Sequence, residues 1–217
     1  MRVRLNKAHF PVTTLGPGRR IGLWFQGCSI GCVGCCSKDT WFHDSEREIE
    51  LDDLLAWCRS VATDGLDGIT VTGGEPFEQP VALAMLLDLL HAWRLELPSP
   101  FDILCYSGFP LRRLERRHAT ILSRLDALIP EPFAEGKPQL RAWRGSANQS
   151  LVLLSELGFE RYDRYVDAKP VSDRRLQVAV ENGAVWMIGI PDRQDLQRLQ
   201  SAAHSRGVVL GGVSWRA

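Results

Sequence analysis

Three cysteines within eight residues constrain this chain more than any other feature. Cys28, Cys32 and Cys35 lie in the stretch CSIGCVGC, directly after the apolar run Ile21–Gln26. A glycine directly precedes each cysteine. Glycine lets the backbone fold closely around a bound group and leaves amide N–H groups free to point at it. The pattern therefore predicts a strand that ends in a loop wrapped around a metal centre.

Three thiolates on one loop can each hold one corner of an iron–sulfur cube. The fourth iron then has no protein ligand, and an open coordination position marks a centre that performs chemistry. The cysteines alone leave two other metal centres open. A zinc site would need a fourth ligand, which His43 or Cys36 could supply. A ferredoxin-type electron carrier would need a fourth cysteine.

A glycine-rich turn, Gly73-Gly74-Glu75-Pro76, follows the predicted buried strand Gly68–Thr72. Parallel sheets bind ligands at the carboxyl ends of their strands. The two glycines permit close approach of a ligand, and Glu75 with a backbone carbonyl can accept hydrogen bonds from an ammonium group. Alone, the turn could simply join a strand to a helix. One strand–helix unit after the cysteines, it predicts a binding site for an amino group beside the cluster.

Strand and helix signals alternate through the first half of the chain, which predicts an α/β fold with a mainly parallel sheet. Leucines at helical spacing indicate helices over residues 51–61, from Pro80 onward and from Leu111 onward. Further strands are expected at Phe101–Tyr106 and Asp126–Ile129. Glu131–Arg144 is rich in proline, glycine and charge and is expected to be a long loop.

The C-terminal part has a different pattern. Arg175–Val180 and Ala184–Ile190 flank Asn182-Gly183, which is a hairpin signal. A helix from Asp192 to about Ser205 and a last strand, Val208–Trp215, are expected to follow. We therefore predict a core of residues 1–170 and a small α+β extension of residues 171–217 packed on it. The side chains expected to bury against the core are Val178, Val180, Val185, Trp186 and Ile188.

Composition and charge exclude some classes of function. Hydrophobic residues make up 45% and charged residues 24%, and the formal net charge is zero. Such a chain has no electrostatic footprint for nucleic acid or an anionic membrane. No stretch resembles a signal peptide or a membrane span, so we expect a cytoplasmic protein, whose cysteines favour metal binding over disulfides. Cys58 and Cys105 fall in predicted apolar elements and are expected in the core, and Cys36 should point away from the cube.

Four stretches together resemble the radical S-adenosylmethionine (SAM) superfamily. Within it, they are most similar to the small activating enzymes of glycyl-radical enzymes, above all the activases of anaerobic ribonucleotide reductase. The stretches are Gly16–Trp41, Thr72–Pro76, Tyr106–Gly108 and Trp143–Gln149. This resemblance implies a shortened (βα) barrel that carries a [4Fe–4S] cluster and SAM at the carboxyl ends of its strands.

The resemblance also implies roles for individual residues. Cys28, Cys32 and Cys35 would be the cluster ligands, and Gly73, Gly74 and Glu75 would receive the SAM amino group. No catalytic side chain is implied beyond the cluster and the SAM site. The residues expected near SAM or lining its site are Ser107, Arg144, Ser146, Asn148 and Gln149.

The implied activity begins with an electron from a donor such as flavodoxin or ferredoxin. SAM is cleaved to a 5′-deoxyadenosyl radical, which takes a hydrogen atom from a glycine of a partner enzyme. The alternative is a radical SAM maturase that acts on a peptide or small molecule held by the extension. A non-catalytic iron–sulfur carrier is a third hypothesis, but such a carrier has no use for the turn Gly73–Glu75.

Three departures from the family pattern bear on these expectations. Gly34 stands where most members have an aromatic residue. Ile129-Pro130-Glu131 stands where activases read Val-Asp-Gly, so the role of that turn is in question. The extension has no counterpart in the shortest activases.

Overall fold

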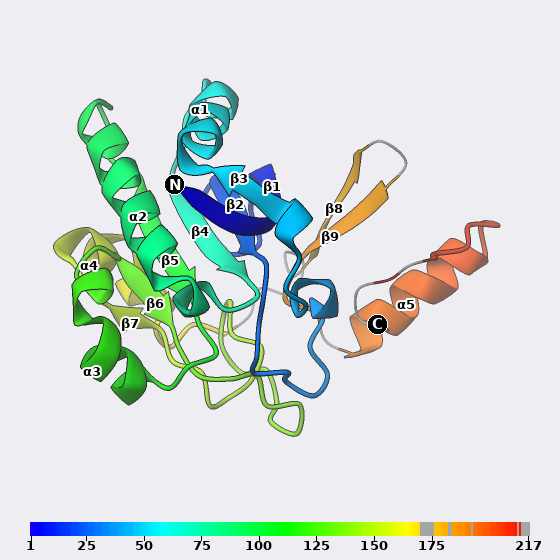
Figure 1. The fold of residues 1–217 in the computed structure, drawn as a ribbon. Coiled ribbons are helices and arrows are strands. Elements are labelled where there is room, and N and C mark those ends of the chain that lie inside the picture. Colours follow the sequence, from blue (N-terminus) through cyan, green and yellow to red (C-terminus); the bar gives the residue numbers. More distant parts are fainter. Residues whose placement is uncertain (170–175, 182–183, 192, 212, 214–217) are drawn as a thin grey trace.

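A seven-stranded sheet in the order β3-β1-β2-β4-β5-β6-β7 forms the centre of the fold (Figure 1). The computed structural model describes residues 1–169, 176–181, 184–191, 193–211 and 213. The four middle strands are parallel, as expected for strands joined by helices. They are β2 (Arg20–Phe25), β4 (Gly68–Gly73), β5 (Asp102–Tyr106) and β6 (Ala127–Ile129). The predicted α/β class is confirmed.

Antiparallel strands flank this parallel core on both sides. β1 (Arg2–Val12) pairs with β2, and β3 (Glu48–Glu50) pairs with the start of β1. On the other side, β7 (Val152–Leu153) pairs with β6. None of these three strands was expected from the sequence. The parallel strands are thereby covered at both edges, which leaves no edge of a core strand open to another chain.

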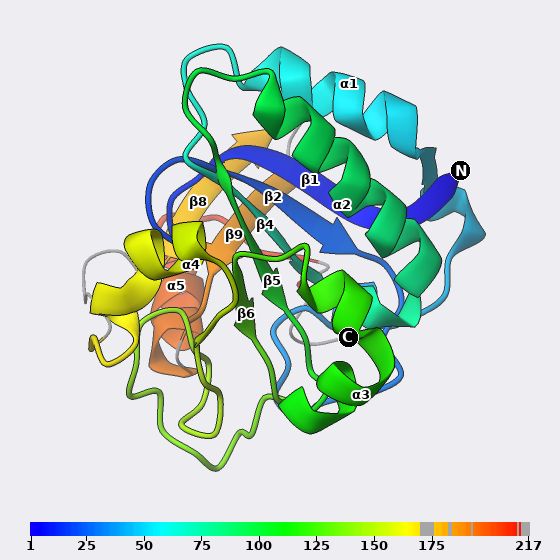
Figure 2. The same cartoon turned by 90° about the vertical axis from the view of Figure 1, so that its left-hand side faces the viewer.

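Three helices cover one face of the sheet, and a fourth packs on the other face, where Tyr162 contacts Leu104 and Ile129 (Figures 1 and 2). α1 (Leu51–Val61), α2 (Pro80–Leu95) and α3 (Leu111–Leu122) bury the leucines that their spacing places on one side, and Cys58 lies among them fully buried. α4 (Glu156–Tyr162) begins at Ser155, whose hydroxyl accepts a hydrogen bond from the Gly158 amide. Among the described residues, no helix combines the length and apolarity needed to cross a bilayer.

The C-terminal extension forms its own two-stranded antiparallel sheet and a helix. The elements are β8 (Leu176–Glu181), β9 (Ala184–Gly189) and α5 (Arg193–His204). The predicted turn Asn182-Gly183 and the predicted cap Asp192 lie outside the described residues. The expected last strand is wrong over Val208–Gly211, which follows α5 without forming a strand.

The hairpin lies across the sheet from α1 and α2 and is attached mainly to β1 and the turn after it (Figure 1). Ile188 is 2% exposed and packs with Val12, Leu15 and Trp24. Its carbonyl accepts a hydrogen bond of 3.0 Å from the Thr14 hydroxyl. The expected burial of this side chain is therefore confirmed.

The expected burial of the three hairpin valines is wrong. Val178, Val180 and Val185 are exposed, Val180 by 69%. The pairing of β8 with β9 explains this, because Gln177 lies opposite Ile188 and Ala179 opposite Trp186. Side chains alternate along a strand, so the face that buries the large residues of β9 turns the valines outward.

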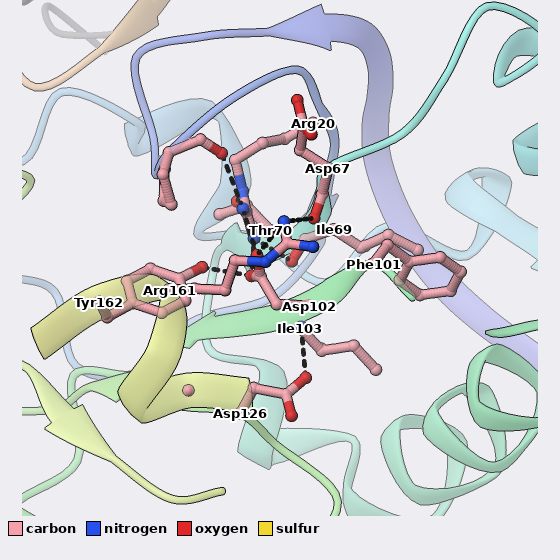
Figure 3. A network of polar contacts seen from close by, with 12 residues as sticks. Arg20, Asp67, Ile69, Thr70, Phe101, Asp102, Ile103, Asp126, Arg161 and Tyr162 are labelled. Atoms are coloured by element: carbon pink, nitrogen blue, oxygen red, sulfur yellow. Dashed lines mark hydrogen bonds and ion pairs between the residues drawn. The ribbon is translucent and has the colours of Figure 1, made fainter. Parts of the chain in front are cut away.

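A buried ion pair holds the amino ends of the parallel strands together (Figure 3). Arg20 and Asp102, at the starts of β2 and β5, have no exposed side-chain surface, and Nη2 of Arg20 lies 2.6 Å from Oδ1 of Asp102. Arg20 also donates to the hydroxyl of Thr70 and the carbonyl of Ile69 on the intervening β4. The Tyr162 hydroxyl donates to the same aspartate and so ties α4 to the sheet.

Replacement of one partner of this pair should strongly destabilise the fold. In Asp102→Asn, the Arg20 charge stays buried without its counterion, and loss of one partner from a buried pair costs about 3–5 kcal/mol. Urea unfolding of the variant and the wild type would measure the free energy of unfolding. The matched control is Glu96→Gln, which breaks the exposed Arg59–Glu96 pair and should leave the free energy of unfolding nearly unchanged. Equal costs for the two variants would contradict this role of Asp102.

Candidate cluster and SAM site

The carboxyl ends of the four parallel strands meet at one cavity of about 120 Å³. The cysteine loop after β2, the end of β4 with its turn, the end of β5 and the loop after β6 all contribute lining residues. The lining residues predicted from the sequence are Cys28, Cys32, Cys35, Gly73, Gly74, Glu75, Ser107 and Gln149. The structure thus brings the cysteine loop and the Gly-Gly-Glu turn together, although 37 residues separate Cys35 from Gly73 in the sequence.

Backbone amides point at the sulfur atoms of the cysteine loop. Burial raises the pKa of the Cys28 thiol, while hydrogen bonds from the amides of Ile30 and Gly31 lower it. Burial likewise raises the pKa of Cys32, and the Phe133 amide opposes that shift. The amide of Ser37 donates to Sγ of Cys35 over 3.4 Å.

This donor set fits an iron–sulfur cluster. Half-buried thiols that receive amide hydrogen bonds are suited to a cluster, whose charge and potential depend on such contacts.

Gln26 anchors the cysteine loop, a role that the sequence analysis missed. Its side-chain amide donates to the carbonyls of Phe42 (2.6 Å) and Asp39 (3.2 Å) on the return segment of the loop. Its oxygen accepts a hydrogen bond of 2.7 Å from Asn6 on β1. A polar residue at the end of an otherwise apolar, fully buried strand was the available signal, because a buried amide needs partners.

The two glycines of the turn are required by contact with the protein itself. A Cβ at Gly74 would lie 2.2 Å from the carbonyl oxygen of Gly27. Gly73 has a φ of 99°, and a Cβ there would meet the backbone of Phe25 at 2.5 Å. The Gly74 and Glu75 amides donate to the carbonyls of Phe25 and Gly27, each over 2.8 Å. The turn therefore packs directly on the start of the cysteine loop.

Glu75 joins the ends of β4 and β5. Its carboxylate is fully buried and accepts hydrogen bonds from the Ser107 hydroxyl (2.8 Å) and from the amides of Gly108 (2.7 Å) and Phe77 (3.0 Å). Burial raises its pKa to about 7, and these three hydrogen bonds act in the opposite direction. Ser107 therefore touches Glu75 directly.

The segment Trp143–Gln149 supports the loop after β6. Ser146 accepts from the Ala134 amide, Asn148 donates to the Pro132 carbonyl, and Gln149 donates to the Glu131 carbonyl. Of the four residues of this segment that were expected to line the SAM site, Gln149 lines the cavity, and Arg144, Ser146 and Asn148 do not. The Arg144 guanidinium donates to the carbonyls of Ala142, Tyr165 and Val166, so it holds the chain behind the cavity wall.

Glu131 adopts a backbone conformation that favours glycine, with a φ of 83°. It stands where the activase pattern described above has glycine. Its carboxylate accepts a hydrogen bond of 3.1 Å from the Leu111 amide at the start of α3. That contact compensates the strain of a left-handed non-glycine residue, which is of the order of 1–2 kcal/mol.

The other three cysteines have different surroundings from Cys28, Cys32 and Cys35. Cys58 and Cys105 are fully buried in the core, as expected. Burial raises the pKa of Cys58 to about 12 and that of Cys36 to about 11.

The chain is similar to one protein family and to several named proteins. A family described as "4Fe-4S single cluster domain" matches residues 14–152, more than half of the chain. The anaerobic ribonucleoside-triphosphate reductase-activating protein of Vibrio cholerae is 31% identical over 148 residues, which are 65% of this chain and 92% of that protein. The protein of the same name from Pasteurella multocida is 33% identical and covered to 91%, and that from Escherichia coli K12 is 29% identical and covered to 93%. The crystal structure of QueE from Escherichia coli has a TM-score of 0.41 and 23% identity, over 50% of this chain and 53% of that one.

Three thiols on a strand-end loop, next to a Gly-Gly-Glu turn, define a radical SAM enzyme. The chain belongs to the 4Fe-4S single-cluster family, in the branch of the anaerobic ribonucleoside-triphosphate reductase-activating proteins. Its cofactors are a [4Fe–4S] cluster and SAM.

The contact of Gly74 with Gly27 generates a prediction about cluster assembly. In Gly74→Ala, the added methyl group would overlap the Gly27 carbonyl, and overpacking of this kind costs about 1–3 kcal/mol. The cysteine loop should shift, and the iron content after anaerobic reconstitution should fall. Gly136→Ala is the control, because a Cβ there meets no atom within 4 Å. Full iron content in Gly74→Ala would show that the close contact does not position the loop.

Proposed function

We propose that this protein installs a glycyl radical on a partner enzyme, as an activase of the anaerobic ribonucleotide reductase type. One observation carries the proposal: the three cysteines and the Gly-Gly-Glu turn line a single cavity at the strand ends. The relatives named as reductase-activating proteins support it, because the match extends over 92% of the Vibrio cholerae protein. The proposed partner is therefore an anaerobic ribonucleoside-triphosphate reductase, and the proposed location is the cytoplasm.

We assign the cluster to Cys28, Cys32 and Cys35 and the SAM amino group to the turn Gly73–Glu75. When bound there, the two cofactors supply the reductive cleavage of SAM to methionine and a 5′-deoxyadenosyl radical. A flavodoxin or ferredoxin is the proposed electron donor. The sheet would then be the shortened (βα) barrel of a core over residues 1–170, with residues 171–217 as its extension.

The hydrogen bonds of Glu75 support its assignment to an ammonium group. A carboxylate offers about four acceptor positions. The Ser107, Phe77 and Gly108 donors use three of them, and the contact to Oε2 comes from the Gly108 amide. One position on Oε2 is left for a ligand donor. The protein donors fix the direction of the carboxylate, so that an incoming ammonium group meets an oriented acceptor.

The ligand assignment predicts different outcomes for the cysteines. Alanine at position 28, 32 or 35 should abolish iron binding and SAM cleavage, since each of Cys28, Cys32 and Cys35 would hold one corner of the cluster. Iron analysis and the yield of 5′-deoxyadenosine measure the two effects. Cys58→Ala and Cys105→Ala serve as controls that should retain about four irons per chain. Retained iron in any of the first three variants would remove that cysteine from the ligand set.

The proposed activity predicts a radical on the partner. The reconstituted protein, SAM, a reductant and the anaerobic ribonucleoside-triphosphate reductase of the same genome should together give a persistent glycyl doublet in EPR. Omission of SAM should abolish that signal. If 5′-deoxyadenosine accumulates without any doublet, the activase proposal is wrong, and a maturase that acts on a peptide or small molecule takes its place.

A further inference from the structure

Residues 38–42 run back from the cysteine loop and support its beginning, and we call them the return segment. The Thr40 carbonyl accepts a hydrogen bond of 2.7 Å from the Gly27 amide. The Trp41 carbonyl accepts one of 3.0 Å from the amide of Cys28, the first of the proposed cluster ligands. The position of the return segment therefore decides where the cysteine loop begins.

An irregularity in β1 directs two side chains at the return segment. The pairing of β1 with β2 shifts its register between Leu5 and Lys7, and a bulge of this kind re-aims the side chains beside it. The Asn6 amide donates to the carbonyl of Asp39 over 3.4 Å. The Lys7 ammonium donates to the carboxylate of the same residue over 3.2 Å. β1 thus holds the return segment at one residue, through both its backbone and its side chain.

Lys7 is the cation that pairs with Asp39, and most of this pair is covered. The two side chains are 26% and 33% exposed. The second carboxylate oxygen of Asp39, Oδ1, is buried and has no hydrogen-bond partner among the described residues. A carboxylate with one oxygen out of water depends on its counterion, because a covered charge without a partner is costly. The return segment is therefore held at Asp39 chiefly by Lys7.

The C-terminal extension reaches Lys7 through Trp186 of β9. The ammonium nitrogen of Lys7 lies 5.5 Å from the centroid of the Trp186 ring, which is a cation–π contact. The same ring packs beside His9, with the two centroids 5.9 Å apart. Lys7 thus lies between an aromatic ring of the extension and a carboxylate of the return segment. The family match ends at residue 152, so the ring is an addition to the matched part of the chain.

We propose that Lys7 and Trp186 are positioning residues for the cluster, through which the extension acts on the cofactor site. Trp186 holds the Lys7 ammonium against Asp39. The return segment is thereby fixed, together with the carbonyls that hold Gly27 and Cys28. The extension supplies no proposed cluster ligand, yet it determines how firmly the cysteine loop is held. The inference rests on the proposed assignment of the cluster to the three cysteines of that loop.

The test uses the full chain after anaerobic reconstitution. Lys7→Met removes the charge, Trp186→Leu removes the ring, and Lys7→Arg keeps the charge and the cation–π contact. The matched controls are Lys169→Met, at an exposed lysine elsewhere, and Val180→Ala, on the outer face of the hairpin. The readouts are the midpoint potential of the cluster and the hydrogen–deuterium exchange rate of the amides of residues 27 and 28.

We expect Lys7→Met to lower the midpoint potential. It leaves the Asp39 carboxylate beside the cysteine loop without its counterion, and reduction adds a further negative charge to the cluster. The amides of residues 27 and 28 should exchange about fivefold faster, because local opening of the loop costs less without the cation–π contact and the ion pair. Trp186→Leu should change both readouts in the same directions. Lys7→Arg and the two controls should keep the wild-type values.

The failures are distinguishable. Iron retained after replacement of a loop cysteine by alanine refutes the ligand assignment, and this inference with it. Loss of iron in those variants, with wild-type potential and exchange in Lys7→Met, refutes the inference alone. A lower melting temperature of Lys7→Met at wild-type potential and exchange would show a merely structural contact and also overturn it. Changes in Lys7→Met that are absent from Trp186→Leu overturn the role of the extension.

Discussion

The contact between the Gly73–Glu75 turn and the start of the cysteine loop is the constraint on which the site depends. Two amide hydrogen bonds of 2.8 Å, from Gly74 to Phe25 and from Glu75 to Gly27, continue the pairing of β2 with β4 past the sheet. No side chain larger than hydrogen fits at Gly74. Because the contact is made by backbone atoms, it fixes the turn against the loop whatever side chains surround them. Glu75 then extends the same arrangement to β5 through Ser107 and Gly108.

The amino ends and the carboxyl ends of the parallel strands have different roles. The amino ends are closed by Arg20 and Asp102, a pair without exposed surface whose hydrogen bonds reach β2, β4, β5 and α4. The carboxyl ends carry loops, cysteines and cavities. The ion pair fixes the amino ends, and a separate set of hydrogen bonds from Gln26, Glu75 and Gln149 holds the loops at the carboxyl ends. This is the usual division in parallel α/β folds, in which stability and chemistry occupy opposite ends of the strands.

Much of the fold could be predicted from the sequence because the buried strands and helices are long and periodic. α1 spans the apolar positions from Leu51 to Val61 that predicted it, and each parallel strand was predicted to within one residue at either end. β1 was missed because Lys7, His9 and Pro11 interrupt its apolar alternation. For the site, the sequence motifs identified residues that recur in the family, but they could not show which atoms those residues contact. Ser146 and Asn148 were expected at the ligand, yet they support the loop that forms the wall.

The hairpin shows why hydrophobicity alone could not orient the extension. Its valines are the stronger apolar signal on β8, but the register places Gln177 and Ala179 beside the larger residues of β9. Ile188 is buried in the core and the ring of Trp186 packs beside His9 of β1, so their face of the hairpin meets the sheet and the valines face outward. That choice also directs the chain after Ile188 toward a cavity of about 490 Å³ at the carboxyl ends of the strands. A segment that holds none of the proposed cluster ligands, Gly189–Pro191 with Gln194 and Leu196, therefore forms part of the wall of this cavity.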